Sequence, residues 1–223
     1  MGQPLYAPED ELTSLPRLTL VGWLMRSRAA VAVISRAPVP LWVLRKVLQR
    51  DNVRENARDG WQRLRDDQES ARYVEVRRMV EKYAAEGVVL DLGCSQGILQ
   101  EGLRYGRYVG VDSAAKSIDL AQGKADERTR FVTGDASTYR PDQAPDATVL
   151  NEVIYYLSDP LQTVQRQARF LAPGGVMVIS LFARAWSCRR LLRRISARLE
   201  LVETALVTSG HLAWTVAVFR PRA

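Results

Sequence analysis

Short apolar runs alternate with longer helical patterns from residue 87 onward. Each run is bounded by polar or turn-forming residues and has the length of a buried β-strand. The pattern predicts strands over 88–91, 108–112, 130–133, 147–151 and 176–181. It predicts helices between them over 97–105, 114–122, 160–171 and 184–197. Because strands joined by helical crossovers pair in parallel, we expect a parallel sheet.

The two ends of the chain have a different pattern. The apolar runs 199–207 and 212–219 are separated by only four residues, too few for a parallel crossover, so they predict an antiparallel hairpin. Prolines interrupt short amphipathic stretches near the N-terminus, and a longer helical pattern runs from about 53 to 83. We therefore predict an α/β protein with a helical N-terminal extension or lid at 1–86 and a core at 87–223.

Residues 88–97, with the sequence VVLDLGCSQG, combine a buried strand, a glycine-containing turn and the start of an expected helix. Gly93 and Gly97 allow a ligand to approach the backbone, and a helix N-terminus would offer free N–H groups. This geometry is typical of a nucleotide site. A dinucleotide fingerprint would have glycines at 95 and 98, where this chain has Ser95 and Ile98, and no Gly-Lys-Ser/Thr triplet follows the turn. NAD, ATP and GTP therefore fit poorly.

Three acidic residues follow three of the expected strands. Asp91 would repel a pyrophosphate but suits a ligand with an ammonium and a sulfonium group, such as S-adenosylmethionine. Asp112 ends the second strand, nineteen residues after Gly93, where a carboxylate can accept bonds from both ribose hydroxyls. Asp135 follows the third strand and can accept a bond from the adenine amino group, while the N–H of Ala136 can donate to a ring nitrogen. Together these groups address a whole adenosine.

Five segments, in this order and spacing, resemble the class I S-adenosylmethionine-dependent methyltransferase family over roughly residues 70–220. They are DLGCSQG at 91–97, YVGVDSA at 108–114, FVTGDAS at 131–137, NEVIYYL at 151–157 and FLAPGGVMVIS at 170–180. The resemblance implies a seven-stranded, mostly parallel Rossmann-like sheet with helices on both faces, and S-adenosyl-L-methionine as the cofactor. Ser95 departs from the glycine of many relatives, and we expect this small side chain to reshape the turn slightly. The implied cofactor-binding residues are Asp91, Gly93, Cys94, Ser95, Gly97, Asp112, Ser113, Asp135, Ala136 and Asn151.

Glu152 and Tyr156 are the candidate catalytic residues, because the resemblance places them beside the methionine end of the cofactor. Tyr156 aligns with a position that is often His in the family, and its phenol could orient an acceptor hydroxyl or amine. Adjacent residues on a helix point about 100° apart, so we expect only one of Tyr155 and Tyr156 to face the pocket. Methyl transfer is an in-line displacement that requires few catalytic side chains, so oxygen and nitrogen acceptors both stay open.

The acceptor class rests on weaker signals. The NEVIYYL stretch is similar to that of methyltransferases of nodulation-factor sugars, which act on amino-sugar nitrogen, and this favours a sugar or another small metabolite. The N-terminal segment carries Trp23, Trp42, Trp61 and Tyr6, and these aromatic residues either close over the acceptor or anchor the segment on the sheet.

Net charge leaves two alternatives open. The formal charge of +7 is concentrated at the ends, with +4 over residues 1–82, −3 over 83–183 and +6 over 184–223. The basic ends and the arginines at 189, 190, 193 and 194 would suit an RNA methyltransferase, but residues 151–154 lack the Asn/Asp-Pro-Pro-Tyr motif of amino-directed nucleic-acid enzymes. Residues 18–54 mix apolar runs with basic residues, as would a membrane-surface methyltransferase that acts on a lipid or a lipid-linked sugar.

Composition argues against several other classes. The sequence has no apolar run long enough to span a membrane and no signal peptide, so we expect a cytoplasmic protein. Two cysteines, Cys94 and Cys188, and the single histidine, His211, do not make a disulfide framework or a zinc site, so no metal is expected. The oligomeric state stays open.

Overall fold

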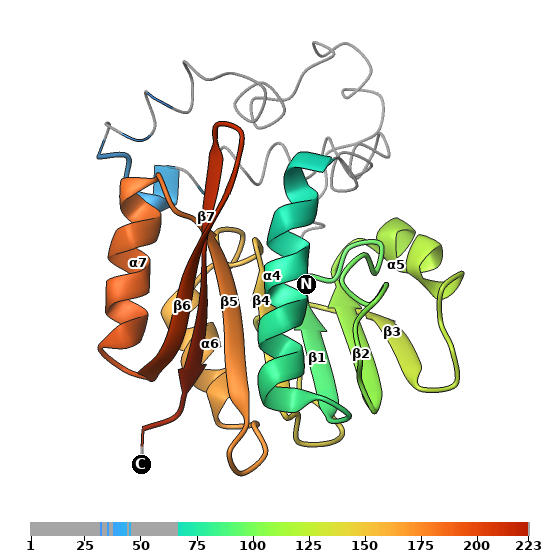
Figure 1. The fold of residues 1–223 in the computed structure, drawn as a ribbon. Helices are drawn as coiled ribbons and strands as arrows, with labels where there is room; N and C mark the ends of the chain where they lie inside the picture. The colour runs from blue at the N-terminus through green and yellow to red at the C-terminus, as the bar shows by residue number, and fades with distance from the viewer. Residues whose placement is uncertain (1–31, 33–34, 36–37, 44, 46–66, 223) are drawn as a thin grey trace, which may run out of the picture.

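The computed structural model describes residues 32, 35, 38–43, 45 and 67–222, and its ordered elements follow the predicted alternation (Figure 1). The predicted lid residues Tyr6, Trp23 and Trp61, and most of the segment 18–54, lie outside the described residues. The elements are α4 (Asp67–Ala84), β1 (Val88–Leu92), β2 (Arg107–Asp112), α5 (Ala115–Gln122), β3 (Thr129–Thr133), β4 (Ala147–Asn151), α6 (Pro160–Ala168), β5 (Val176–Phe182), α7 (Trp186–Ser196), β6 (Glu200–Ser209) and β7 (Leu212–Arg220).

The strands form a seven-stranded sheet in the order β3-β2-β1-β4-β5-β7-β6. The first five strands along the chain pair in parallel, while β7 is antiparallel to both β5 and β6. This confirms the predicted mostly parallel sheet and its C-terminal hairpin. The chain passes from β1 to β2 on one side and later to β4 on the other, so the winding reverses between β1 and β4. Ligands bind at this kind of switch point, outside the carboxyl ends of the strands.

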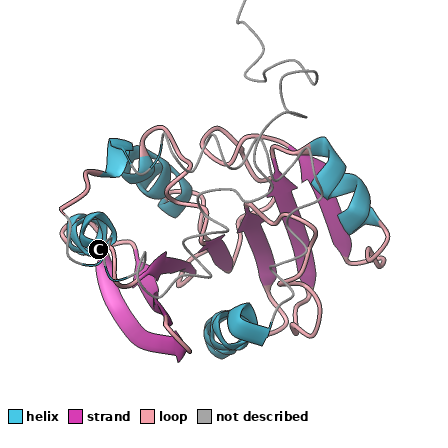
Figure 2. Cartoon of the chain, turned by 90° about the horizontal axis from the view of Figure 1, so that it is seen from above, coloured by secondary structure: helices cyan, strands magenta, loops and turns pink. Residues whose placement is uncertain are grey.

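Helices cover both faces of the sheet, as predicted (Figures 1 and 2). Alternate residues along each buried strand face opposite layers, because successive strand side chains point to opposite sides. Leu90 and Leu150 belong to the core beneath α6 and α7, whereas their neighbours Val89 and Val149 belong to the core beneath α4 and α5. The strands are therefore apolar on both faces, as expected for a parallel sheet buried between helices.

Helix α4 packs across the sheet and contacts β1, β4, β5, β6 and β7. Its buried residues Tyr73, Val76, Met79 and Val80 recur at helical spacing and form one apolar stripe. Helix α4, which is the described end of the proposed N-terminal extension, thus packs on the sheet as part of the core. The domain boundary at residue 86 stays a prediction.

The predicted helix over 97–105 is wrong, because these residues form a series of turns. Gly97 and Gly102 have φ angles of 70° and 78°, in the left-handed region, which interrupts a right-handed helix. Two of the carbonyls that a helix would bond internally are bound instead by Arg77 of α4, at 2.6 Å to Ile98 O and 3.0 Å to Leu99 O. The helix N-terminus expected to face a ligand is therefore replaced by a turn that a side chain stabilises.

Among the helices in the described part of the chain, none is both long enough and apolar enough to cross a bilayer.

Candidate active site

The sequence-predicted residues lie along the carboxyl edge of the sheet, following the strand order. Asp135 comes after β3, Asp112 ends β2, the turn 93–97 follows β1, and Asn151 ends β4. The structure joins two of these directly, because Asp112 Oδ2 accepts a hydrogen bond of 2.8 Å from the backbone N–H of Ser95. The edge therefore presents an ordered row of acceptors on both sides of the switch point.

The turn after β1 depends on left-handed backbone angles. Gly93 has a φ of 83°, Ser95 of 48° and Gly97 of 70°. The N–H of Gly93 donates to Val111 O at 2.7 Å, which folds the turn back over the end of β2. A Cβ atom on Gly93 would lie 2.3 Å from Cγ2 of Val153, so no larger residue fits there. Ser95 has a left-handed backbone conformation that is uncommon for a residue with a side chain, and its effect on the turn relative to a glycine stays a prediction.

Asp112 fixes this turn and retains acceptor capacity. Its Oδ1 accepts from the N–H of Ala114 at 2.9 Å, in addition to the bond from Ser95. An ionised carboxylate has about four acceptor positions, so about two remain for the hydroxyls of a ribose. Burial raises the pKa of Asp112, and the backbone donors oppose this shift. Ser113, the next residue, is exposed.

Asp91 is the most deeply buried acid of the site, with 2% of its surface exposed. The Tyr108 hydroxyl donates to Asp91 Oδ2 at 2.5 Å. Burial raises the pKa of Asp91 to about 7, the Tyr108 bond opposes the shift, and the charge of Asp112 adds to it. Two buried oxygens in this part of the site, Asp91 Oδ1 and Ser95 Oγ, have no hydrogen-bond partner among the described residues. Unsatisfied buried acceptors are rare, and these fit a ligand that brings hydrogen-bond donors or a positive charge.

The other predicted cofactor contacts have local roles in the structure. Asp135 is exposed, and its Oδ1 accepts from the N–H and hydroxyl of Ser137 at 2.7 and 2.6 Å. Ala136 is buried, and its carbonyl accepts from Gln167 at 3.3 Å. Cys94 is also buried, and burial raises the pKa of its thiol well above the usual value. Their contacts with adenosine stay predictions.

Glu152 follows β4 directly and has a φ of 59°, a left-handed conformation that is unfavourable for a residue with a side chain. The Ser180 hydroxyl of β5 holds this conformation, because it accepts from the Glu152 N–H at 2.9 Å and donates to Asn151 Oδ1 at 2.8 Å. The Glu152 side chain is partly exposed. Burial raises the pKa of its carboxyl to about 7, while Arg72 and the Tyr155 hydroxyl oppose the shift. Glu152 is therefore poised to exchange a proton near neutral pH.

Of the two adjacent tyrosines, Tyr155 is the one that contacts Glu152. The buried Tyr155 hydroxyl donates to Glu152 Oε1 at 2.6 Å and accepts from the N–H of Phe182. Tyr156 is half-buried, with its ring centroid 6.4 Å from that of Tyr155. The segment forms turns, so the helical spacing used to separate the two tyrosines does not apply. A catalytic role for Tyr156 stays a prediction.

Sequence reasoning did not single out Arg72 of α4, which has 1% of its surface exposed. Its guanidinium pairs with Glu69 at 2.6 Å and donates to Asn151 Oδ1. It also lies 4.6 Å from the ring centroid of Tyr73 and 5.6 Å from that of Trp214. Both members of the ion pair lie on the buried stripe of the helix. Charged residues are rarely buried unless they are paired, so their position on an apolar stripe could have indicated a buried ion pair from the sequence. Arg72 thus connects α4 to the end of β4.

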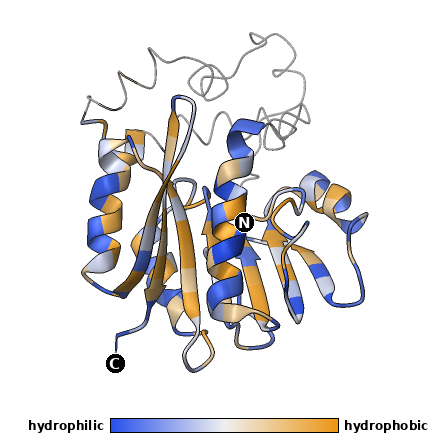
Figure 3. Cartoon of the chain, viewed as in Figure 1, coloured by the Kyte–Doolittle hydropathy of each residue, from blue (hydrophilic) through white to orange (hydrophobic). Residues whose placement is uncertain are grey.

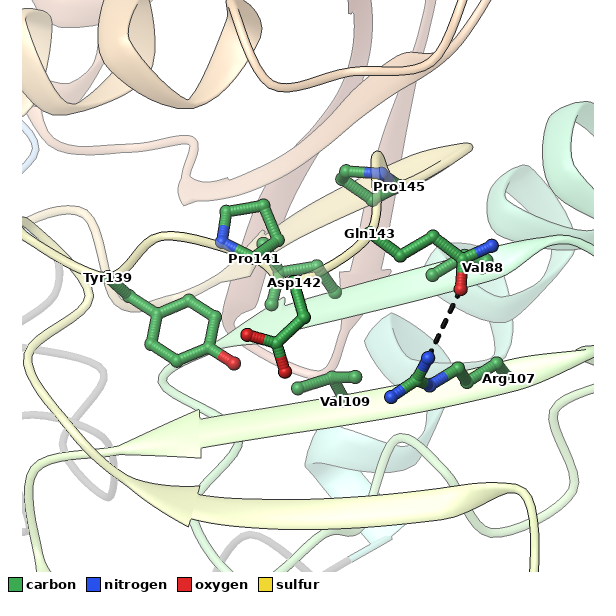
Figure 4. A pocket seen from close by; sticks show the side chains of 9 residues that line it. Val88, Arg107, Val109, Tyr139, Pro141, Asp142, Gln143 and Pro145 are labelled. Atoms are coloured by element: carbon green, nitrogen blue, oxygen red, sulfur yellow. Dashed lines mark hydrogen bonds between the residues drawn. The ribbon is translucent and has the colours of Figure 1, made fainter.

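A pocket at the opposite end of the strands is separate from this site (Figure 4). It lies against the start of β1 and β2, and Arg107 donates to Gln143 at 3.2 Å across it. Its free volume is about 10 Å³, the space of a single water molecule, so it cannot hold a nucleoside.

Comparison with known proteins adds independent evidence. A model of the methyltransferase domain family matches residues 53–217. The chain is 29% identical over 118 residues to trans-aconitate 2-methyltransferase of Methylobacterium radiotolerans, a match that covers 51% of this chain and 45% of that protein. It is 35% identical over 100 residues to the ubiquinone biosynthesis O-methyltransferase of Paracidovorax citrulli, covering 41% and 42% of the two chains. The chain thus spans less than half the length of these curated relatives.

Solved structures show the same fold. The N-methyltransferase NodS of Bradyrhizobium japonicum WM9, crystallised with S-adenosyl-L-homocysteine, superposes with a TM-score of 0.65 at 22% identity, covering 80% of this chain and 98% of that one. Because the family model matches residues 53–217, which make up most of the chain, this protein belongs to the class I S-adenosylmethionine-dependent methyltransferase family.

Proposed function

We propose that this protein transfers the methyl group of S-adenosylmethionine to an oxygen or nitrogen atom of a small-molecule acceptor, with Glu152 as the general base. The observation that carries this proposal is the position of Glu152 at the switch point, with a raised carboxyl pKa and a conformation that Ser180 and Tyr155 hold in place. Family membership supports the cofactor.

The cofactor is assigned to the row of acceptors from β3 to β1. Asp112 offers its remaining acceptor positions to the ribose, and Asp135 with Ala136 lies where the adenine would be bound. Gly93 and Gly97 allow the left-handed angles of the turn, where a side chain would collide with Val153 or Phe131. The unsatisfied oxygens of Asp91 and Ser95, at the centre of the row, suit a ligand with donor groups and positive charge.

The chemistry divides between the cofactor and the chain. Bound S-adenosylmethionine supplies a methyl group activated by its sulfonium. The acceptor oxygen or nitrogen forms a bond to this methyl group as the carbon–sulfur bond breaks, and its proton passes to Glu152. Tyr155 orients the Glu152 carboxyl through its 2.6 Å bond, and Arg72 favours the ionised form that accepts the proton.

Relatives that act on small molecules support the acceptor class. The proteins that this chain matches include an O-methyltransferase of ubiquinone biosynthesis and an N-methyltransferase. A base with a pKa of about 7 can serve a hydroxyl or a protonated amine, so the geometry of Glu152 is compatible with both. We propose a sugar or another small metabolite as the acceptor.

The test is methyl transfer by the full chain from S-adenosylmethionine to a panel of amino sugars, sugars, hydroxy acids, small amines and RNA. Formation of S-adenosylhomocysteine is measured with the wild type, Glu152→Gln and the control Glu200→Gln, which changes an exposed residue of β6. We expect kcat/KM to fall by about 10²- to 10⁴-fold in Glu152→Gln and to stay unchanged in the control.

Two results would count against the proposal. If Glu152→Gln were as active as the wild type across pH 6–9, Glu152 would not be the base. If only RNA accepted methyl groups, the acceptor class would be wrong, and the RNA alternative suggested by the basic ends of the chain would replace it.

A further inference from the structure

The forty residues from 160 to 199 contain eight arginines and no Asp, Glu or Lys. Half of these arginines lie on α7, whose apolar side faces the core through Cys188, Leu191 and Ile195. Its outward side is strongly hydrophilic (Figure 3). Five exposed arginines on and just after this helix form what we call the α7 arginine stripe: Arg189, Arg190, Arg193, Arg194 and Arg198.

The stripe is costly to the isolated protein. Arg189 and Arg193, Arg190 and Arg194, and Arg194 and Arg198 are like-charged pairs at i,i+4 spacing, which destabilises a helix. In the described part of the chain, no salt bridge involves any of these five residues. Their internal contacts are with carbonyl oxygens or an aromatic ring, as in the bond of 2.6 Å from Arg189 to Arg184 O.

The basic residues on the exposed face of helix α4 differ from the stripe, because they are paired with acidic residues. There Arg78 pairs with Glu75 at 2.7 Å and with Glu203 at 2.8 Å, and Lys82 pairs with Glu203 at 2.6 Å. Charges of both signs thus alternate on α4, whereas the stripe on α7 has a single sign. Within the described residues the stripe therefore has no complementary carboxylates, and its charge suits an anionic surface supplied by a partner.

Exposed leucines lie beside the stripe. Leu201 and Leu206 of β6 have 42% and 68% of their surface exposed. Leu201 pairs with Phe219, whose side chain belongs to the core beneath α7, so Leu201 projects from the same face of the sheet. Leu206 pairs with Thr215, at an even spacing from Phe219 along β7, and so also projects from that face. Figures 1 and 2 both show α7 and β6 side by side.

We propose that the face formed by the α7 arginine stripe with Leu201 and Leu206 docks on an anionic phospholipid surface. One guanidinium group can donate two parallel hydrogen bonds to the oxygens of a phosphate. Neighbouring leucines can enter the boundary between the lipid headgroups and the acyl chains. A nucleic acid would bind the arginines but would leave the leucines in water. The half-buried Trp186 lies beneath Arg190, with its ring centroid 5.3 Å from the guanidinium, so it is covered rather than presented for base stacking.

The test is co-sedimentation of the full chain, without cofactor, with vesicles of phosphatidylcholine alone or mixed with phosphatidylglycerol. We expect binding only to the mixed vesicles, with release at high salt. Each basic residue near an anionic surface contributes about fivefold to binding, so Arg190→Gln/Arg194→Gln should weaken it about 25-fold. The control Arg104→Gln/Arg140→Gln removes the same charge from exposed positions elsewhere and should have little effect. Circular dichroism verifies that each variant is folded.

Leu206→Ser distinguishes a lipid surface from other polyanions. We expect it to weaken vesicle binding about tenfold, because it removes an apolar side chain that enters the bilayer. The proposal is overturned if the wild type does not bind the mixed vesicles, or if the two arginine pairs have equal effects. It is also overturned if Leu206→Ser binds the mixed vesicles as well as the wild type does and the wild type also binds RNA at low salt. That pair of results would assign the stripe to nucleic acid. None of these outcomes depends on methyl transfer.

Discussion

Replacing Glu152 with glutamine should stabilise the protein above neutral pH, even though we expect it to lower activity. The carboxyl is desolvated, and its pKa in the folded protein is about 7, compared with 4.5 for an unperturbed glutamate. The folded state therefore keeps its proton over a pH range in which the unfolded chain has already released it. The contribution of Glu152 to the free energy of unfolding is therefore most favourable below pH 4.5. It declines as the pH rises to about 7, where the folded carboxyl also ionises.

The size of the effect follows from the shift. A difference of about 2.5 pKa units at about 1.4 kcal/mol each gives up to about 3 kcal/mol, reduced to the extent that solvent screens the partly exposed side chain. The glutamine side chain of the variant would keep an acceptor for the Tyr155 hydroxyl but would carry no charge. Asp91 also has a raised pKa, but it is present in both proteins, so its contribution cancels in the difference.

The assay is urea denaturation of the wild type and Glu152→Gln from pH 4 to pH 8.5. We expect nearly equal free energies of unfolding at pH 4 and a variant that is more stable by up to about 3 kcal/mol at pH 8. A gap that does not change with pH, or a variant that is less stable at pH 8, would refute the reasoning from desolvation.

Two further substitutions test the turn and its support. Ser180→Ala leaves the part-buried N–H of Glu152 without an acceptor, although Asn151 Oδ1 still accepts from Arg72, and should cost roughly 1–3 kcal/mol of unfolding free energy. Activity should fall with it, and a variant as stable as the wild type would contradict this role. Gly93→Ala places a Cβ 2.3 Å from Val153 at a φ of 83°, so we expect a cost of about 1–3 kcal/mol and loss of cofactor affinity, and unchanged calorimetric binding would argue against a tight turn.

Much of the fold could be predicted because its signals are local in sequence. Every predicted strand overlaps an observed one, since short apolar runs bounded by turn residues identify buried strands, and a four-residue connection allows only an antiparallel hairpin. The predicted helix over 97–105 is wrong for a tertiary reason. Its apolar spacing resembles a helix, but Gly97 and Gly102 take left-handed angles, and Arg77, about twenty residues earlier, binds the carbonyls of Ile98 and Leu99.

The residues of the candidate site also divide into those with a local sequence signal and those whose role depends on tertiary contacts. Asp91 and Asp112 could be placed at the carboxyl edge of the sheet, because one lies in the last two residues of β1 and the other ends β2. Arg72 and Ser180 could not, because their roles arise from bonds to Asn151 across 79 and 29 residues of sequence. The contact of Tyr155 with Glu152 could not be predicted either, because helical spacing does not describe a segment in which the chain makes turns.

Calorimetric titration with S-adenosylmethionine and S-adenosylhomocysteine tests the central claim most directly. We expect micromolar binding to the wild type, a loss of about 10- to 100-fold in Asp112→Ala, and no change in the control Asp119→Ala, which alters an exposed acid of α5. Absence of binding to the folded wild type, or equal affinity of the wild type and Asp112→Ala, would contradict the assignment of the cofactor to this edge of the sheet.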